Sequence, residues 1–390
     1  MKSALPSGVV ALGLVSLFMD MSSEMIHALL PLYLTAGLGA SALVVGLIEG
    51  AGEATAQITK VFSGYFSDLT GKRKTLAVAG YGLSALTKPL FALAGSPALI
   101  LGARVADRVG KGIRGAPRDA LVADLVPPEQ RGAAFGLRQS MDTVGAFAGP
   151  LLAVLFMLLF RGNVPLIFTL AIIPATIAVA ILVVFVREPP RFSPVKPPLR
   201  LGRNLLARIG PGVWVAMTIG AVMTLARFSE AFLILRAGEA GLPITYAPLV
   251  LVAMNLIYAV TAWPAGVLSD RIGKSGLLAL GFAVLVAADL VLGFGQGLGM
   301  VFFGVTLWGL HMGLTQGLLA AMVADATPAE LRGTAFGLFN LATGLCLLLS
   351  NVLAGAAWAS IGSAATFGIG AGLAVLSLFA FAVHRIRIMG

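Results

Sequence analysis

The sequence has few charged residues and almost no cysteine. Of its 390 residues, 11% are Asp, Glu, Lys or Arg, whereas soluble domains carry about 25%. So few polar groups cannot cover the surface of a water-soluble fold of this length, and a lipid bilayer must therefore surround most of the chain. The one cysteine, Cys346, lies in an apolar run and excludes an internal disulfide.

Several catalytic motifs are also absent. The sequence has no glycine-rich loop followed by Lys and Ser or Thr, no helix with two histidines around a glutamate, and no nucleophile turn with a serine between glycines. These absences argue against an enzyme and against a pump that hydrolyses ATP on this chain. We therefore predict no enzymatic activity and no bound cofactor.

Long apolar runs dominate what is present. Hydrophobic residues make up 58% of the chain and the mean hydropathy is +0.96. A spanning helix needs about 20 mostly apolar residues, and the first run, from about Val9, shows no small-residue cleavage site, so we expect it to be retained. We predict an all-α membrane protein with twelve transmembrane helices, at 8–35, 42–66, 76–94, 98–123, 132–160, 164–186, 210–236, 245–268, 276–294, 298–324, 333–360 and 363–384.

The positive charges are unevenly distributed between these runs. The net charge is +10, and bases gather in the links after even-numbered runs, at 72–74, 187–208 and 271–274. An excess of Lys and Arg marks the cytoplasmic side of a membrane protein. The charge therefore indicates orientation rather than nucleic-acid binding, and we predict a multi-pass protein of a bacterial-type inner (plasma) membrane with both termini in the cytoplasm.

The chain repeats itself in two halves. The segment 122–137 matches 323–338 at an offset of 201 residues, and 64–72 matches 266–274 at an offset of 202. Between the copies lies 187–208, which is rich in proline and arginine and suits an extended tether. Repeats of the same topology are expected for halves related by an axis along the membrane normal. We predict two pseudo-symmetric six-helix bundles, 1–186 and 209–390, joined by a cytoplasmic linker at 187–208.

The repeated loop resembles the loop between helices 2 and 3 of the major facilitator superfamily, and the helix count and repeat extend this resemblance over essentially the whole chain. The resemblance implies gating by alternating access, although the bases of the loop could serve orientation alone. The residues that carry it are Gly64, Asp68, Gly71, Lys72 and Arg73, with Asp270, Gly273 and Lys274 in the second copy.

A second motif resembles helix 5 of family members that exchange substrate for protons. Its residues are Gly136, Gly145, Gly149 and Pro150. Glycines at this spacing allow a helix to lie close to a neighbour, which we expect to come from the other half, and Pro150 bends the helix. The resemblance implies antiport and favours export, whereas ordinary small-residue packing is the simpler alternative.

The predicted helix 98–123 carries an unusual row of charges. Seven ionisable side chains fall within about 140° of its circumference, and such a row needs water or partners of opposite sign. We expect this row, with polar residues of the second half, to line a central substrate cavity. The candidate substrate-binding residues are Arg104, Arg108, Lys111, Arg114, Arg118, Trp308, His311 and Gln316.

Other predicted helices contain acidic residues. A carboxylate that alternates between a basic partner and a proton would couple transport to a proton gradient, whereas permanent pairing with arginines would be purely structural. The candidates for proton coupling are Asp20, Glu24, Glu49, Glu53, Asp142 and Glu230.

Three classes of substrate remain open. The excess of bases favours a small anion, such as an organic acid, an organophosphate or an anionic metal chelate. An amphiphilic, drug-like compound is the second alternative. The third is a divalent metal ion held by Asp20, Glu24 and His27, whose oxygen and imidazole ligands suit transition metals. In each case we predict a secondary transporter that acts as a monomer in the bilayer on a small molecule.

Overall fold

The computed structural model describes residues 5–188, 211–327 and 332–389, and these residues form helices and connecting turns without a strand among them. The chain divides into two compact units. The first comprises Met1–Leu30 and Thr55–Leu199, and the second comprises Pro31–Ala54 and Arg200–Gly390. One helix, α3 (Ala42–Thr70), contributes its two halves to different units.

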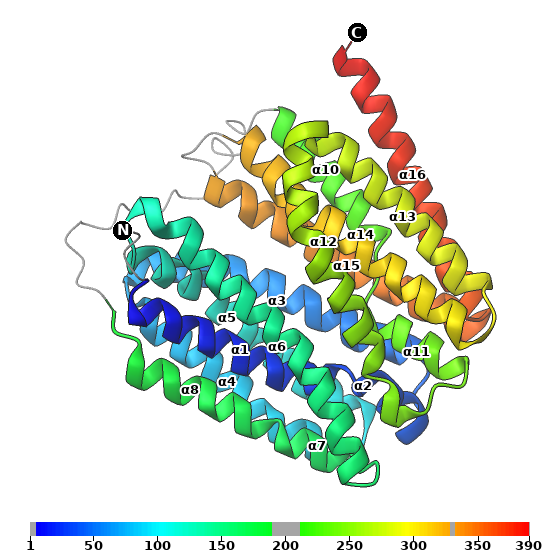
Figure 1. The fold of residues 1–390 in the computed structure, drawn as a ribbon, viewed down its shortest axis with the longest axis horizontal. Coiled ribbons are helices and arrows are strands. Elements are labelled where there is room, and N and C mark those ends of the chain that lie inside the picture. The colour runs from blue at the N-terminus through cyan, green and yellow to red at the C-terminus, as the bar shows by residue number, and fades with distance from the viewer. Residues whose placement is uncertain (1–4, 189–210, 328–331, 390) are drawn as a thin grey trace. The chain divides into compact units, whose positions relative to one another are not determined.

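The first unit is a bundle of long antiparallel helices (Figure 1). Helix α1 packs against α6 and α8, and α4 packs against α5. Its core contains Leu12 and Met19 from α1, Tyr81 from α4 and Leu182 from α8. Besides the second half of α3, its elements are α1 (Ser7–His27), α4 (Arg73–Leu93), α5 (Pro97–Asp124), η2 (Pro128–Gln130), α6 (Arg131–Leu159), α7 (Val164–Leu170) and α8 (Ile172–Phe185).

The second unit contains the helices of the second half of the chain. Helix α13 packs against α14 and α16, and α12 packs against α14. Besides the first half of α3, its elements are α2 (Leu30–Leu32, from its second residue), the π-turn η1 (Tyr33–Gly37), α10 (Pro211–Leu225), α11 (Ala231–Glu239), η3 (Ile244–Tyr246), α12 (Leu249–Ile272), α13 (Lys274–Phe294), α14 (Gly297–Ala326), α15 (Arg332–Ser360) and α16 (Ser363–Met389).

Each of the twelve predicted spans coincides with helix in the described residues, but four spans are interrupted. The span predicted at 8–35 ends as α1 at His27 and continues as α2 and η1. The span predicted at 210–236 stops at Leu225 and resumes at Ala231. The span predicted at 164–186 is interrupted at Ala171, and the span predicted at 245–268 is interrupted at 247–248, between η3 and α12. The first two interruptions occupy equivalent places in the repeat, because α2 and α11 begin 201 residues apart.

Side chains of α15 stabilise the interruption between α10 and α11, which we call the 226–230 break. The backbone N–H of Ser229 donates to Asn351 Oδ1 at 2.8 Å, and Ser350 Oγ donates to the carbonyl of Arg227 at 3.1 Å. The N–H of Ala231 donates to Ser229 Oγ at 3.2 Å. Backbone groups that leave a helix inside a bilayer need such partners, since no water replaces them.

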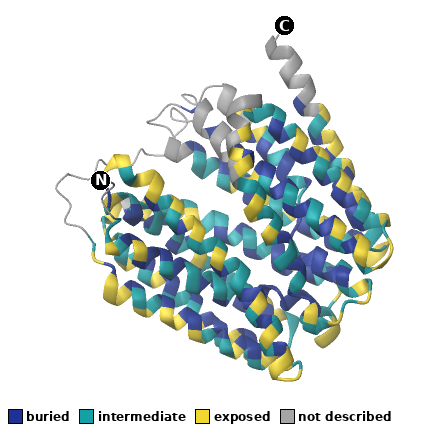
Figure 2. Ribbon diagram, viewed as in Figure 1, coloured by how far each residue is buried: buried dark blue, intermediate teal, exposed yellow. Residues whose placement is uncertain are grey.

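Many large apolar side chains of both units are exposed, and Figure 2 marks the exposed positions of the helices in yellow. Leu86, Leu93 and Phe379 are 70% or more exposed. A protein that exposes so much apolar surface needs lipid to cover it. Within the described residues, eight helical segments are long and apolar enough to cross a membrane. Helix α5 is not among them because of its charges, so the sequence of α5 requires partners inside the protein.

The sequence repeat is also a structural repeat. Gly71 and Gly273 end the helices before the paired loops with φ of 70° and 80°, a backbone conformation that side chains other than glycine rarely adopt. Gly112 on α5 packs on Thr59 of α3, and its counterpart Gly313 on α14 packs on Thr261 of α12. The two halves therefore build the same helix contacts from equivalent residues.

Candidate substrate and proton site

The row of charges on α5 is mostly buried. Arg104, Asp107, Arg108 and Arg114 are 2–6% exposed, whereas Lys111 is exposed. Buried charges in an apolar protein must be compensated by partners, because they lose their hydration. Helices α1, α4 and α6 of the same unit supply partners for several members of the row.

A buried ion pair joins α4 to α5. Lys88 Nζ lies 3.1 Å from Asp107 Oδ1, and both side chains are at most 6% exposed. Ser23 of α1 accepts a second hydrogen bond from Lys88 Nζ at 3.1 Å, and Thr87 donates to the same Asp107 oxygen at 3.4 Å. Lys88 is thus the direct partner of Asp107, which also interacts electrostatically with Arg104, Arg108 and Arg114.

Two arginines of α5 make hydrogen bonds to side chains of α1 and α4. Arg104 donates to His27 Nδ1 of α1 at 2.9 Å. Arg114 donates to Ser84 Oγ at 2.9 Å, and its guanidinium lies 4.6 Å from the centre of the Tyr81 ring, a cation–π contact. These contacts fix the arginines without removing their charge.

A second group of ion pairs lies further along α5. Arg118 contacts Asp119 at 3.0 Å, and Arg138 of α6 contacts Asp119 at 3.8 Å. Arg138 also pairs with Asp142 at 3.1 Å, one helical turn away on α6. Arg138 and Asp142 are four residues apart on α6 and therefore lie on the same face of the helix.

Two carboxyl groups meet beside these bases. Asp20 of α1 and Asp142 of α6 face each other in side-chain hydrogen-bond contact, and a contact between two carboxyl groups requires a proton on one of them. Arg114 Nη2 lies 4.0 Å from Asp20, and Lys111 interacts electrostatically with both carboxyls. The pair therefore has basic partners within reach.

We call this group the charged cluster. It contains seven bases and four acids, all from the first unit, so it carries a net positive charge. Its members are Asp20, Lys88, Arg104, Asp107, Arg108, Lys111, Arg114, Arg118, Asp119, Arg138 and Asp142.

The predicted metal ligands do not come together. Asp20 faces Asp142 and Arg114, whereas His27 contacts Arg104. Throughout the described part of the chain, no group of three His, Cys, Asp or Glu side chains is placed to hold a metal ion. The structure therefore does not assemble Asp20, Glu24 and His27 as a metal site, and arginines lie against two of the three side chains.

The other candidate acids lie outside the Asp20–Asp142 pair. Glu24 is half-buried on α1, next to Gly149 of α6. Glu49 on the first half of α3 is 1% exposed and accepts from Ser229 Oγ at 3.3 Å, within the second unit. Glu53 follows one turn later on α3 and is half-buried, and Glu230 immediately precedes α11.

The candidates in the second half lie in different environments. Trp308 and His311 on α14 are at most 1% exposed, and His311 Nδ1 contacts the carbonyl of Gly281 at 2.8 Å. Trp308 packs on Phe228 of the 226–230 break, with ring centres 5.3 Å apart. Gln316, two turns along α14, is exposed. Trp308 and His311 thus form part of an aromatic core rather than a polar lining.

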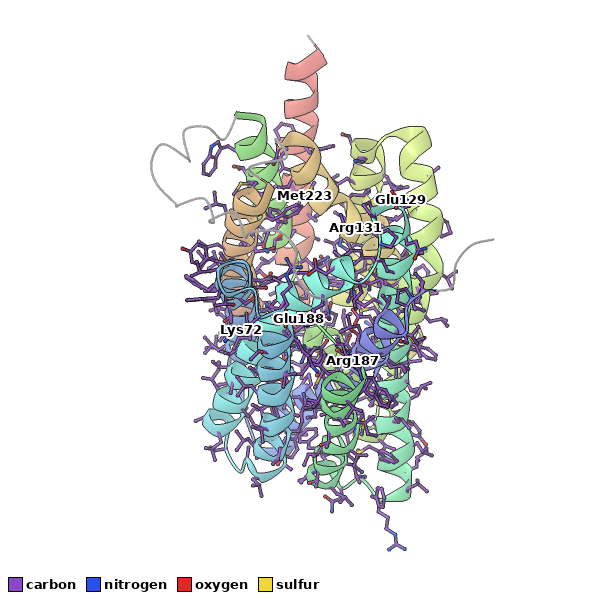
Figure 3. All side chains as sticks on the ribbon, turned by 90° about the vertical axis from the view of Figure 1, so that its left-hand side faces the viewer. Lys72, Glu129, Arg131, Arg187, Glu188 and Met223 are labelled. Carbon is purple, nitrogen blue, oxygen red and sulfur yellow. The ribbon has the colours of Figure 1, made fainter. Side chains whose placement is uncertain are left out.

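The repeated loop of the first unit is connected to its neighbours. Arg73 donates to the carbonyl of Ala120 at 3.1 Å and pairs with Asp124, which belongs to the other repeated segment. Glu188 accepts from the backbone N–H of Arg73 at 2.7 Å, at the start of α4. Figure 3 shows Lys72, Glu129, Arg131, Arg187 and Glu188 at the same end of this unit.

Part of the predicted gating set falls outside what the structure describes. The side chains of Asp68 and Asp270 belong to that part, while their backbones are helical. Gly64 on α3 lies 3.5 Å from Ala116 of α5, measured from the position of an added Cβ, whereas Lys274 begins α13. Gating by the two aspartates therefore stays a prediction from sequence.

The glycines of the helix-5 motif contact a different neighbour from the one expected. A Cβ at Gly149 would lie 2.6 Å from the carbonyl oxygen of Met21, and one at Gly145 would collide with that of Leu17. Both carbonyls belong to α1 of the same unit, and the expectation of a neighbour from the other half is wrong. Gly136 faces open space, and Pro150 is buried.

Two repeated helical units, with a charged cluster buried inside one of them, are the arrangement that is typical of secondary membrane transporters. The sequence profile of the Major Facilitator Superfamily matches residues 12–345 and 216–388. The chain belongs to this superfamily, and it is a transporter rather than an enzyme.

Relatives and solved structures agree with this assignment. An uncharacterised MFS-type transporter of Methanocaldococcus jannaschii is 34% identical over 383 residues, which cover 96% of this chain and 94% of the relative. The multidrug resistance protein MdtH of Cronobacter sakazakii is 26% identical over 315 residues, covering 78% and 75%. The crystal structure of the nucleoside transporter NupG has a TM-score of 0.79 at 12% identity, covering 96% of this chain and 99% of NupG, a likeness in fold alone.

Proposed function

We propose that this transporter exports a small anionic compound across the plasma membrane by alternating access, in exchange for protons. The observation that carries the proposal is the net positive charge of the charged cluster. Arginine and lysine side chains bind carboxylate and phosphate groups, and a buried setting strengthens that attraction. Lys111 is the exposed base of the row and is the group that an incoming anion reaches first.

The Asp20–Asp142 pair is the proposed site of the coupling proton. The contact between the two carboxyls already holds one proton, and Arg114 and Lys111 are the bases that stabilise the ionised state. Exchange requires that proton and substrate bind in turn. The helix-5 motif and the MdtH relatives support the outward direction.

We also propose the orientation and the domain division already drawn from sequence. Figure 3 places Lys72, Arg131 and Arg187 at one end of the first unit, and an excess of bases favours the cytoplasmic side. Both termini then lie in the cytoplasm, with 187–208 as the linker between the halves. A single chain is the proposed transporting form.

A second candidate is the export of amphiphilic drugs. The resemblance to multidrug resistance proteins named MdtH favours it, with 26% identity over 315 residues to the relative from Cronobacter sakazakii. The aromatic residues around Trp308 would suit an apolar ligand. The two candidates differ in the charge of the ligand that stabilises the protein.

A thermal-shift screen of the purified protein against anionic metabolites, metal ions and lipophilic drugs would separate the candidates. We expect organic acids or organophosphates to stabilise the protein. In everted vesicles with an acidic lumen, the same anions should release luminal protons. Stabilisation by lipophilic cations alone would reject the anion in favour of the drug, and anion binding without proton movement would reject the coupling.

Variants of the row test which residues bind the anion. Arg108→Ala or Lys111→Ala should weaken anion binding by about 10- to 100-fold, since a hydrogen bond to a charged group contributes about 1.5–3 kcal/mol. The protein should remain folded and in the membrane. Arg131→Ala, which removes an exposed base at the end of the unit, is the matched control. Wild-type transport in both variants of the row would reject the basic site.

A further inference from the structure

Asp289 on α13 is a buried acid that the charged cluster does not use. Its side chain is 0% exposed, and neither carboxyl oxygen has a hydrogen-bond partner in the described residues. A Cβ placed on Gly370 of α16 would lie 2.7 Å from Asp289 Oδ2 and 2.9 Å from the Phe228 ring. Because an ionised carboxylate in such surroundings would lose its hydration without replacement, Asp289 is held as the neutral acid in this conformation.

The repeat shows what is unusual about this acid. At the offset of 201 residues, Asp289 is the counterpart of Lys88, and Trp308 is the counterpart of Asp107. Lys88 and Asp107 form the buried ion pair of the first unit. In the second unit an acid, Asp289, takes the position of the base Lys88. The uncharged indole of Trp308 takes the position of the acid Asp107.

The equivalence is structural as well as numerical. Gly80 on α4 packs on Arg114 of α5, and Gly281 on α13 packs on Thr315 of α14, each again 201 residues apart. The contact between α4 and α5 is thus repeated between α13 and α14. Asp289 therefore lies at the position in the second unit that corresponds to the buried ion pair of the first unit. The position of the oppositely charged partner is taken by Trp308, which carries no charge.

Two further polar atoms, both on α14, have no hydrogen-bond partner in the described residues. They are the buried Trp308 Nε1 and His311 Nε2. The Phe228 ring packs on Trp308, and it approaches the Gly370 position of α16 as Asp289 Oδ2 does. Buried polar groups are nearly always satisfied in native proteins, so three such side chains on the packed helices α13 and α14 need an explanation.

We propose that Asp289 is a second proton-binding site of the transport cycle, loaded in this conformation and emptied when α13 and α16 move apart. The proton is the ligand that fits, because the buried carboxyl has no polar partner among the described residues that would complete a site for a larger ion. After ionisation, Trp308 Nε1 is the candidate donor, because it has no partner in the described residues and lies on α14 at the repeat position of Asp107. The inference rests on the proton-coupled transport proposed above.

The other titratable groups around Asp289 are few. Helix α14 contributes His311, which interacts electrostatically with Arg227 of the 226–230 break. Arg236 of α11 donates to the carbonyls of Leu292 and Gly295 at the end of α13, each at 2.8 Å. The described side chains of α12 include Tyr258 as a titratable group, and those of α16 include none.

Carbodiimide labelling tests whether the proton is present. Dicyclohexylcarbodiimide adds a protonated carboxyl group across one C=N bond and rearranges to a stable N-acylurea, with no leaving group. Mass spectrometry of the purified full chain should find this adduct on Asp289, in amounts that fall as the pH is raised. The paired acid Asp107 is the internal control and should stay unlabelled.

Hydrogen–deuterium exchange tests the coupling to movement. After correction for the intrinsic rate, peptides of α13 and α16 should exchange several-fold faster at alkaline pH in the wild-type protein. Asp289→Asn keeps the shape of the neutral acid and should abolish this increase, whereas Glu129→Gln, an exposed acid of the first unit, should preserve it. An identical pH profile in wild type and Asp289→Asn overturns the proposal, whatever the labelling yields.

The two proposals can fail separately. Labelling and exchange need no transported compound, so they judge Asp289 even if the anion screen fails. If anions move protons in vesicles but Asp289→Asn exchanges as the wild type does, the transport proposal stands and the second proton site is rejected.

Discussion

At the scale of single residues, the buried pair of Lys88 and Asp107 allows a clear prediction. Lys88→Met leaves Asp107 as an uncompensated charge and should destabilise the protein by about 3–5 kcal/mol. The double variant Lys88→Met with Asp107→Leu removes both charges and should recover most of that loss. Unfolding of the purified variants in detergent, induced by denaturant or by heat, measures both changes in the free energy of unfolding.

An exposed lysine provides the control for this cycle. Lys72→Met removes the same charge at the surface of the first unit and should change the free energy of unfolding little. If the double variant is no more stable than Lys88→Met, the loss comes from packing, and the ion pair is not its cause.

The sequence predicted which residues of α5 share a face but not what they contact. A helical wheel places Arg104 to Asp119 on one side because that depends on local spacing. It cannot show that Lys88 of α4 takes Asp107 or that Asp20 of α1 meets Asp142 of α6. Asp289 was missed altogether, although an aspartate in an apolar run, 201 residues after Lys88, was a usable signal.

At the scale of helices, the packing of α6 on α1 depends on glycine at defined positions. Gly149→Ala puts a Cβ 2.6 Å from the carbonyl oxygen of Met21, so one helix must shift. Overpacking of this kind costs about 1–3 kcal/mol. We expect a lower melting temperature of the purified protein in detergent.

Gly136 offers the matched comparison on the same helix. Its added Cβ meets nothing within 4 Å, so Gly136→Ala should gain helix propensity, about 1 kcal/mol in stability. Equal effects of alanine at the two positions would contradict the close approach of α6 to α1.

Helix positions were predictable from apolar runs, whereas helix breaks were not. The segment 226–230 contains neither proline nor glycine, and nothing local ends the helix there. The break is stabilised by Asn351, which is 122 residues further along the chain than Ser229. A contact so distant in sequence leaves no periodic signal. The break after His27 lies at the equivalent position of the repeat, but it too is visible only in the structure.

At the scale of the whole molecule, the repeat is the feature that sequence revealed most fully. Offsets of 201 and 202 residues align loops whose glycines share positive φ, and they align helix contacts at Gly112 and Gly313. The same offsets expose where the halves differ. The first half has an intramembrane ion pair, and the second has an acid among aromatic rings, so proton chemistry need not be symmetric in the two halves.

The repeated loops lead to a prediction about turnover of the whole transporter. Asp68 precedes a loop whose Arg73 pairs with Asp124, so the two repeated segments of the first half are joined at one end of the bundle. If Asp68 forms contacts that break as the protein switches between its two open states, Asp68→Asn should spare ligand binding and slow cycling. A tenfold slower exchange corresponds to about 1.4 kcal/mol in the barrier. Counterflow in proteoliposomes measures the rate of cycling, and thermal-shift titration measures the affinity for ligand, so the two effects are separated.

Glu129→Gln is the control, because it removes an exposed acid at the same end of the unit and should leave both the cycling rate and the affinity unchanged (Figure 3). Wild-type turnover in Asp68→Asn would mean that the loop orients the protein in the membrane without gating it.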